Sequence, residues 1–214
     1  MVKFDQNLTI NCTPEFKIAI ESFYKDKTVF QIGPGKGFFT RILKGVSLRI
    51  TGIEIDPLFS EDLRKEGFQI INSDFKNWIL EKENILTKLP DPELTLFSSL
   101  PYSQLKTLFT CSLYFEGYFI APYYLQNKKG CFSNYLRYCY EIKQISIVPN
   151  NYFKPIPNIS SYYYFIKRIR KISYSTFKNL FPNSLRLINK KFNLKKRLHE
   201  LTINELALIL NDYY

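Results

Sequence analysis

Residues 31–37, Gln-Ile-Gly-Pro-Gly-Lys-Gly, decide the fold of this 214-residue chain. They follow a short apolar run, Thr28 to Ile32, and precede a segment that we expect to be a helix ending near Lys44. Glycine has no side chain to collide with a ligand and adopts positive φ freely, so this loop lets the backbone approach a bound molecule closely. Strand, glycine loop and helix in this order predict the first half of a β-α-β unit with a ligand at the loop.

The same alternation continues over the first 150 residues. Further strands are expected at Arg49 to Ile55, Phe68 to Asn72, Leu94 to Phe97, Tyr118 to Leu125 and Gln144 to Val148. Helices are expected from Thr13-Pro14 onward, where threonine caps and proline opens the first turn, and over Pro57 to Lys65 and Gln104 to Tyr114. Strands separated by helices predict an α/β fold with a parallel sheet covered on both faces.

The pattern changes near residue 150, where three prolines fall between residues 149 and 157. One extended aromatic stretch, Ser161 to Ile166, is followed by lysine-rich helical patterns, and Thr202 to Glu205 has the spacing of a capping box. We therefore expect a main domain over residues 1–150 and a small, mostly helical domain over residues 151–214.

The positive charge gathers in that second segment. The chain has a net charge of +11, and residues 151–214, with 12 basic and three acidic residues, supply +9 of it. No acid interrupts the eleven basic residues from Lys167 to Arg197. Such a surface suits a polyanion such as RNA, whose phosphates release counterions when they are neutralised, and a solvated basic face is the alternative.

Cysteine and histidine usage argues against several kinds of site. The only histidine is His199, and no two of the four cysteines have metal-ligand spacing: Cys12, Cys111, Cys131 and Cys139. We expect reduced, buried thiols, no metal site and no nucleophile–histidine pair. The first residues lack an apolar signal core, and no apolar run approaches the roughly 18 residues of a membrane span, so we expect a protein that is neither secreted nor inserted in a membrane.

Two acids end the strands that follow the glycine loop. Glu54 ends the second strand, where a carboxylate can accept both hydroxyls of a ribose. Asp74 ends the third, where a carboxylate can accept the exocyclic amine of an adenine while Phe75 packs on the ring. The carboxyl ends of parallel strands meet at one edge of a sheet, so loop and acids are expected to form one adenosine-shaped crevice. Singly, each acid could equally be a helix cap or a surface residue.

The fourth strand ends in Ser98-Ser99-Leu100-Pro101-Tyr102. Enzymes that methylate a base amine hold it at such a place, where a polar side chain and a backbone carbonyl accept its hydrogens and an aromatic ring stacks on the flipped-out base. Catalysis of this kind works by positioning the nitrogen lone pair and needs no acid or base.

In their order, these motifs resemble those of the ribosomal RNA adenine dimethyltransferases. This family includes bacterial small-subunit dimethylases, macrolide-resistance methylases and mitochondrial transcription factor B proteins. The similar segments are Gln6 to Leu8, the glycine loop with Phe39-Thr40, Glu54 to Asp56, Ser73 to Phe75, Ser99 to Tyr102, Val148-Pro149, Phe153 to Ser161, and Phe177 to Leu210 as a basic helical tail. The resemblance implies a Rossmann-like class I S-adenosylmethionine methyltransferase sheet with a small, mostly helical C-terminal domain.

The resemblance also implies roles for individual residues. The expected cofactor-binding residues are Gln31, Gly33, Gly35, Gly37, Glu54, Asp74, Phe75 and Ser99. The expected catalytic residues are Ser99, Leu100, Tyr102 and Phe153, with Tyr102 stacked on the target adenine and Phe153 facing it from the other side. Family members transfer two methyl groups to the exocyclic nitrogen of adenines in ribosomal RNA. Core packing is the alternative role for Tyr102 and Phe153.

Three departures weaken the enzyme interpretation. Gln31 stands where the family usually has an acid, Ser99 stands where it has an asparagine, and Gln126 to Gly130 is shorter than the family's basic loop. A serine hydroxyl reaches less far than an asparagine amide, and a misplacement of about 1 Å can cost about a hundredfold in rate.

Two hypotheses therefore stay open. The first is an active methyltransferase on structured, ribosomal RNA. The second is a catalytically inactive homologue that serves as a structural subunit of a mitochondrial ribosome or another large organellar assembly, or as a transcription factor B-like protein. Abundant Tyr, Phe, Lys, Asn and Ile with only three alanines indicates coding DNA rich in A and T, as in organelles or reduced parasites and symbionts. A mitochondrial location, including an organelle-encoded origin, and a cytoplasmic one both fit.

Overall fold

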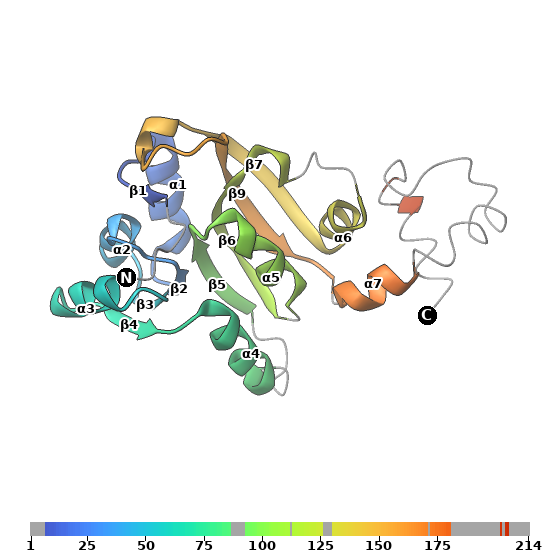
Figure 1. The fold of residues 1–214 in the computed structure, drawn as a ribbon, viewed down its shortest axis with the longest axis horizontal. Helices are drawn as coiled ribbons and strands as arrows, with labels where there is room; N and C mark the ends of the chain where they lie inside the picture. The colour runs from blue at the N-terminus through green and yellow to red at the C-terminus, as the bar shows by residue number, and fades with distance from the viewer. Residues whose placement is uncertain are drawn as a thin grey trace.

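The computed structural model describes residues 7–86, 93–111, 113–125, 130–170 and 172–180, together with residues 202, 204 and 205. Their centre is a seven-stranded sheet with the order β4-β3-β2-β5-β6-β9-β7, and a two-stranded sheet joins β1 to β8 (Figure 1). The strands of the large sheet are β2 (Thr28–Ile32), β3 (Arg49–Glu54), β4 (Gln69–Asn72), β5 (Glu93–Ser98), β6 (Tyr114–Pro122), β7 (Tyr140–Val148) and β9 (Ser161–Arg168). Those of the small sheet are β1 (Leu8–Thr9) and β8 (Phe153–Lys154).

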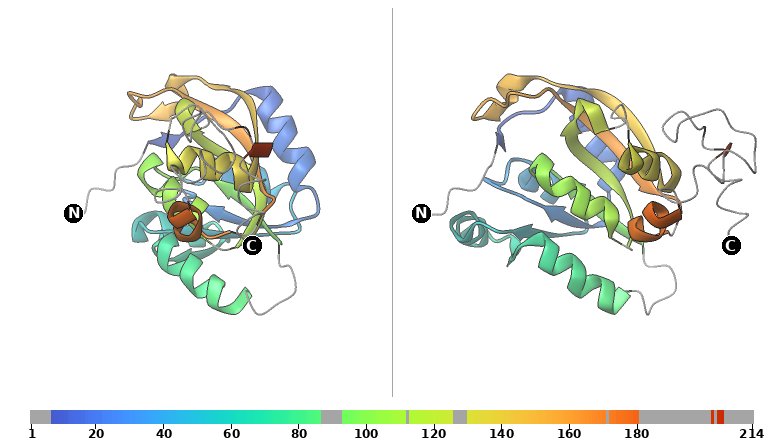
Figure 2. Two further views of the ribbon diagram at one scale, coloured as in Figure 1. Left: turned by 90° about the vertical axis from the view of Figure 1, so that its right-hand side faces the viewer. Right: turned by 45° about the vertical axis from the view of Figure 1, so that its right-hand side comes forward.

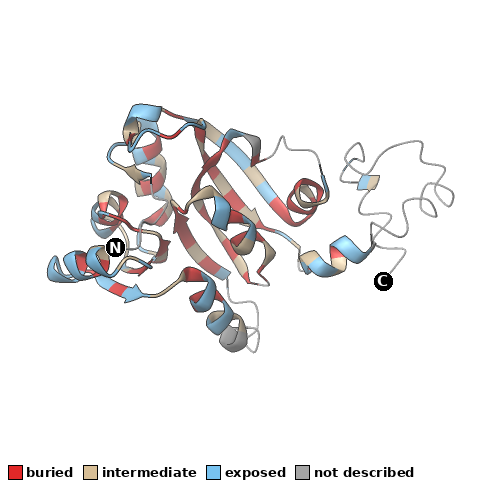
Figure 3. Cartoon of the chain, in the orientation of Figure 1, coloured by how far each residue is buried: buried red, intermediate tan, exposed pale blue. Residues whose placement is uncertain are grey.

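Helices cover both faces of the large sheet. They are α1 (Pro14–Tyr24), α2 (Phe38–Lys44), α3 (Pro57–Lys65), α4 (Phe75–Leu86), α5 (Leu105–Thr110), α6 (Cys131–Cys139) and α7 (Tyr174–Leu180). On one face α1 and α2 bury Phe16 and Phe39 against Phe97 of β5. On the other, Phe109 of α5 and Tyr135 of α6 belong to a second apolar cluster. Buried residues run along β5, β6 and β9 between the two layers (Figure 3).

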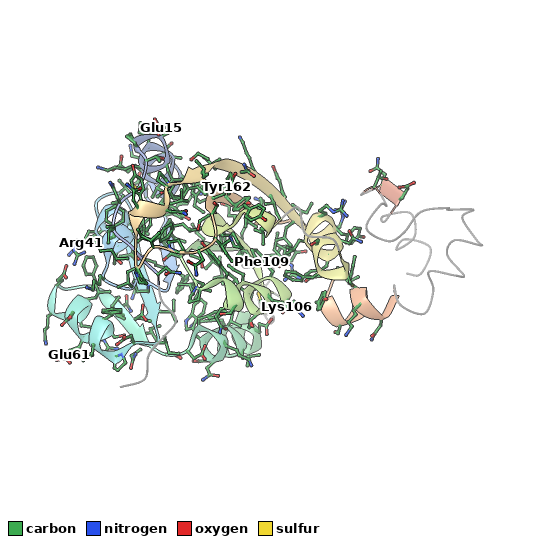
Figure 4. The ribbon with its side chains drawn as sticks, turned by 45° about the horizontal axis from the view of Figure 1, so that its top comes forward. Glu15, Arg41, Glu61, Lys106, Phe109 and Tyr162 are labelled. Atoms are coloured by element: carbon green, nitrogen blue, oxygen red, sulfur yellow. The ribbon has the colours of Figure 1, made fainter. Side chains whose placement is uncertain are left out.

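The helices present one face to these clusters because their apolar residues recur with the helical period. In α5 the ring of Phe109 is fully buried, whereas Lys106, one turn earlier, is exposed and points outward (Figure 4). At the start of α1, Thr13 Oγ1 accepts a hydrogen bond of 3.3 Å from Phe16 N, and Pro14 occupies the first turn. The expected cap is thus confirmed.

Five neighbouring strands, β4-β3-β2-β5-β6, are parallel, as the alternation of strands and helices predicts. Strand β9 is the exception, because it pairs antiparallel with both β6 and β7, and β7 again runs in the direction of β6. The expectation of an all-parallel sheet is therefore wrong at this edge. Strand β7 and strand β9 form a hairpin around the proline-containing segment, and β9 enters the sheet between its two partners.

The sheet consequently extends beyond the domain boundary that we expected near residue 150. The aromatic stretch Ser161 to Ile166 belongs to β9 and is almost continuously buried. Both of its faces are covered, which explains its lack of polar alternation. The change in composition at the prolines marks the connection between β7 and β9.

The bounds of three elements differ by more than one residue from the expected ones. Strand β6 starts at Tyr114 and ends at Pro122, α5 ends at Thr110, and β7 starts at Tyr140. Helix α6, which the sequence did not suggest, buries the polar residues Ser133 and Asn134 beside aromatic ones.

The greater part of the expected helical domain, residues 181–201 and 206–214, lies outside the described residues, and so does most of the basic run to Arg197. Thr202 and Glu205, which are described, confirm the expected capping box: Glu205 N donates to Thr202 Oγ1 at 3.2 Å, and Thr202 N donates to Glu205 Oε2 at 2.7 Å. Helix α7 lies at the opposite end of the molecule from β1 (Figure 2).

No helix within the described ranges is long and apolar enough to cross a membrane. The described residues also contain no group of three or more His, Cys, Asp or Glu side chains that could hold a metal ion. All four cysteines are free, but only Cys111 and Cys139 are buried, which corrects the expectation that all are. Burial raises the pKa of both buried thiols to about 12, so they stay protonated at neutral pH.

Candidate functional site

A cavity of about 420 Å³ opens where the parallel strands end, a size typical of small-molecule sites. Its walls come from the loop after β2, the end of β3, the turn after β4, the segment after β5, and the β1–β8 ribbon. They include Asn7, Leu8, Gly33, Pro34, Gly35, Lys36, Glu54, Ile55, Ser73, Asp74, Phe75, Ser99, Leu100, Pro101, Tyr102, Gln104, Phe153 and Ile159. Most of the side chains chosen from the sequence thus meet in one hollow.

The glycine loop forms the floor of this cavity. Gly33 and Gly35 have φ values of +69° and +55°, which side-chain-bearing residues rarely adopt. Gly33 N donates to the Ile53 carbonyl of β3 at 2.9 Å, which fixes the loop to the neighbouring strand. A Cβ on Gly35 would lie 2.9 Å from Leu8 Cδ2, so the N-terminal ribbon packs directly on the loop.

Gly37 and Gln31 lie apart from the cavity walls. Gly37 has a φ of +81°, and a Cβ there would come within 2.4 Å of Leu63 Cδ2, so its bare face allows α3 to pack close. Gln31 in β2 is fully buried, and within the described part of the chain its two amide atoms have no hydrogen-bond partner. The structure therefore does not join either residue to the other expected cofactor-binding residues.

Glu54 is almost completely buried at the end of β3, with 2% of its surface exposed. Gly35 N donates to its Oε2 at 2.8 Å, and Asp56 N donates to its Oε1 at 2.9 Å. Burial raises the pKa of the carboxyl group, and the two backbone amides partly oppose this rise. Each carboxylate oxygen keeps acceptor capacity toward the cavity.

Asp74 and Phe75 form the next wall, at the start of α4. Asp74 Oδ1 accepts a hydrogen bond of 2.9 Å from Lys76 N, so this carboxylate serves as a helix cap as well as lining the cavity. The Phe75 ring is buried below it. The alternative role as a cap is therefore present beside the expected one, and Oδ2 is left for a ligand.

The segment after β5 is tied to the glycine loop. Ser99 Oγ donates to the Gly33 carbonyl oxygen at 2.9 Å, and Ser99 N donates to the Ile32 carbonyl oxygen at 3.3 Å. Leu100 is buried beneath the loop, and Tyr102 is half-buried in the cavity wall. The Tyr102 hydroxyl forms a hydrogen bond with Ser161 Oγ, at the first residue of β9.

Phe153 supplies an aromatic ring from a distant part of the chain. It is nearly buried in β8, opposite Thr9 of β1, and it lines the same cavity as Tyr102. Both residues also belong to the apolar packing, so wall and core are not exclusive roles here. The sequence analysis assigned no role to Thr9, Ile159 or Ser161. Ile159 and Ser161 lie within a segment that carries the family resemblance, and Thr9 directly follows another.

The family model described as "Ribosomal RNA adenine dimethylase" matches residues 7–211. The chain belongs to this family. The matched range includes the Ser99 to Tyr102 segment.

Two curated relatives illustrate how far the similarity to this family extends. The ribosomal RNA small subunit methyltransferase A of Malacoplasma penetrans is 27% identical over 205 residues, which cover 88% of this chain and 74% of the relative. The protein of the same name from Treponema denticola is 25% identical over 218 residues, covering 91% and 72%.

Two solved structures share the fold of this adenine dimethylase family member. The 23S rRNA methyltransferase ErmE aligns with a TM-score of 0.64 at 13% identity, over 94% of this chain and 97% of that one. A dimethyladenosine transferase from Plasmodium falciparum aligns with a TM-score of 0.57 at 14% identity, over 96% and 88%. At such identities the likeness establishes the fold alone.

Proposed function

We propose that this chain binds S-adenosylmethionine in the cavity and transfers its sulfonium methyl group, one per cofactor molecule, to the exocyclic amine of adenines in structured ribosomal RNA. One observation carries the proposal: a single hollow joins a positive-φ glycine loop, a buried carboxylate, a second carboxylate and the Ser99 to Tyr102 segment. The family membership supports the same reaction and the same class of substrate.

The residues present fit the cofactor. The ionised Glu54 carboxylate, already held by two backbone amides, has acceptor capacity left for the two hydroxyls of a ribose. Asp74 Oδ2 is available to an adenine amine, and the bare backbone of Gly33 and Gly35 leaves room for the methionine part. S-adenosylmethionine, when bound, supplies the electrophilic methyl group.

The chain's own contribution to transfer is to hold the target amine. Because Ser99 Oγ donates its hydrogen to Gly33, the oxygen presents only lone pairs to other groups and acts as an acceptor. We assign it one hydrogen of the adenine amine, and we assign the Leu100 carbonyl the other. Tyr102 and Phe153 supply aromatic surfaces for the base. Two acceptors and two rings fix the direction of the nitrogen lone pair, which is positioning catalysis.

Binding and transfer can be tested separately. Titration calorimetry of the full chain with S-adenosylmethionine should give saturable heat. Incubation with unmodified small-subunit ribosomal RNA, transcribed in vitro, should yield mono- or dimethyladenosine after digestion to nucleosides. Tyr102→Ala should abolish transfer and leave cofactor affinity unchanged, because the ring faces the base and not the cofactor-binding carboxylates. Absence of heat with the wild-type protein would rule out the cofactor part of the proposal.

The second candidate function is a non-catalytic RNA-binding subunit, for example in a mitochondrial ribosome or related assembly. Two observations favour it: the buried Gln31 amide has no hydrogen-bond partner among the described residues and lies apart from the cavity, and the proposed amine-binding residue is a short serine. Cofactor binding and RNA binding without any methyl transfer would support this function. In either case the +9 charge of residues 151–214 should make RNA affinity fall steeply with salt concentration.

A further inference from the structure

We propose that Ser161 is a positioning residue for methyl transfer, because it holds the Tyr102 ring in the orientation that stacks on the target base. This inference rests on the proposed function and names a residue of the same site. Ser161 lies in the segment Phe153 to Ser161 that resembles the family, yet neither cofactor binding nor amine binding, as proposed above, uses it.

The contact itself joins two distant segments. The Tyr102 hydroxyl and Ser161 Oγ form a hydrogen bond across 59 positions of the sequence. Tyr102 begins a single 3₁₀ turn, Tyr102–Gln104, whose other two residues are exposed. The Tyr102 ring packs on one side against the apolar cluster, and the hydrogen bond of its hydroxyl adds a fixed point at the far end of the ring.

Ser161 can hold the Tyr102 hydroxyl in place because its own position is fixed by the sheet. It is fully buried and is the first residue of β9, the strand between β6 and β7 (Figure 1). Its backbone pairs with Pro122 on one side and with Val148 on the other. A hydroxyl on such a strand stays fixed relative to the sheet, and hence relative to the glycine loop.

The same segment also carries the opposite aromatic wall. Phe153 in β8 is separated from Ser161 by one loop, whose Ile159 lines the cavity as well. Residues 153–161 therefore supply one ring directly and fix the second ring through its hydroxyl. A stacked base is sensitive to the tilt and offset of both rings, since displacements of about 1 Å can change rates about a hundredfold.

The test is a double-mutant cycle on methyl transfer with the full chain. Ser161→Ala, Tyr102→Phe and the double variant are compared with wild type for kcat on in-vitro-transcribed small-subunit RNA. Each single variant keeps the ring and loses the hydrogen bond, so each should lower kcat about tenfold. If Ser161 acts through the Tyr102 hydroxyl, the double variant should be no slower than either single variant.

Two further measurements separate positioning from general damage. The dissociation constant for S-adenosylmethionine should stay within about twofold in all three variants, because neither residue belongs to the carboxylate and glycine part of the site. The matched control is Ser160→Ala, which removes the neighbouring hydroxyl and should leave kcat unchanged. Tyrosine labelled with ¹³C at the ring carbon bearing oxygen should show a shifted Tyr102 signal in Ser161→Ala and an unshifted one in Ser160→Ala.

Additive losses in the cycle, a full-rate Tyr102→Phe, or a Ser160→Ala as slow as Ser161→Ala would overturn the inference while leaving the proposed function intact. If Ser161→Ala fails to fold, Tyr102→Phe alone still measures the value of the bond. A wild-type protein that binds the cofactor and RNA but transfers no methyl group would overturn both statements.

Discussion

The Ser99 hydroxyl donates its hydrogen to the Gly33 carbonyl oxygen at 2.9 Å, so the proposed amine-binding segment after β5 is fastened to the glycine loop after β2. One contact therefore connects the proposed binding sites of the target amine and of the cofactor. The bond also fixes how the serine can act, because a hydroxyl that has donated its hydrogen can only accept.

Removing this hydroxyl should impair transfer more than binding. Ser99→Ala deletes an acceptor for the target amine, and we expect kcat to fall about 10- to 100-fold with cofactor affinity changed less. Ser99→Asn, which brings in the family's usual residue, should raise kcat. Ser103→Ala is the control, since that exposed serine lines the same cavity without contacting Gly33. Equal activity of wild type and Ser99→Ala would remove Ser99 from the proposed mechanism.

Cofactor affinity should depend on pH through Glu54. Burial raises the pKa of this carboxyl group above its ordinary 4.5, and only the ionised form can accept two ribose hydroxyls. Affinity for S-adenosylmethionine should therefore weaken as pH falls through the raised pKa, at a higher pH than for an exposed glutamate. Calorimetry across pH 5 to 8 measures this, and Glu54→Gln should bind weakly with a flatter profile. If the affinities of wild type and Glu54→Gln changed with pH in the same way, the assignment of Glu54 to the ribose would be contradicted.

The same raised pKa affects folding with the opposite sign. A carboxyl group whose pKa is higher in the folded than in the unfolded state costs stability when it is ionised. This cost is absent below the unfolded value, 4.5, and is complete once the pH exceeds the folded pKa. In the ligand-free protein, Glu54→Gln should therefore gain stability relative to wild type as the pH rises through this window, as urea unfolding at several pH values can show. A stability difference between the two proteins that stays the same at every pH would contradict this expectation.

Gly37 and Gly67 offer a matched pair. Both have left-handed φ values, +81° and +85°, but a Cβ meets Leu63 at Gly37 and nothing within 4 Å at Gly67. Gly67→Ala should cost only the conformational strain, about 1–2 kcal/mol of unfolding free energy. Gly37→Ala should cost more, because Leu63 of α3 must shift as well. Equal losses would show that α3 does not need the bare face of Gly37.

Tyr24 stabilises the centre of the sheet. Its hydroxyl donates to the Leu96 carbonyl oxygen of β5 and accepts a hydrogen bond of 2.7 Å from Tyr118 N of β6. Tyr24→Phe leaves both buried backbone groups without this partner, so we expect a loss of about 1–3 kcal/mol in urea unfolding. Tyr162→Phe, on a half-buried ring of β9, should change stability by less than about 0.5 kcal/mol. A Tyr24→Phe protein as stable as this control would refute the bridging role.

Several features of the fold follow from short stretches of the chain. The order strand, glycine loop, helix follows from apolar runs and from the φ freedom of glycine, and the cap at Thr13 follows from local backbone bonding. The carboxylates at Glu54 and Asp74 could be assigned to one cavity because parallel strands end at the same edge of a sheet. These inferences need only local spacing and one topological rule.

The contacts between distant segments that complete the site could not be predicted and come from the three-dimensional structure. The insertion of β9 between β6 and β7, the pairing of β1 with β8, and the bond between Tyr102 and Ser161 join residues far apart in the chain. From the sequence, Gln31 and Gly37 were expected to bind the cofactor together with Gly33 and Gly35. In the structure both are buried in packing and neither lines the cavity. The physical reason is that strand pairing and side-chain burial are set by packing of the whole core, which has no local signal in the sequence.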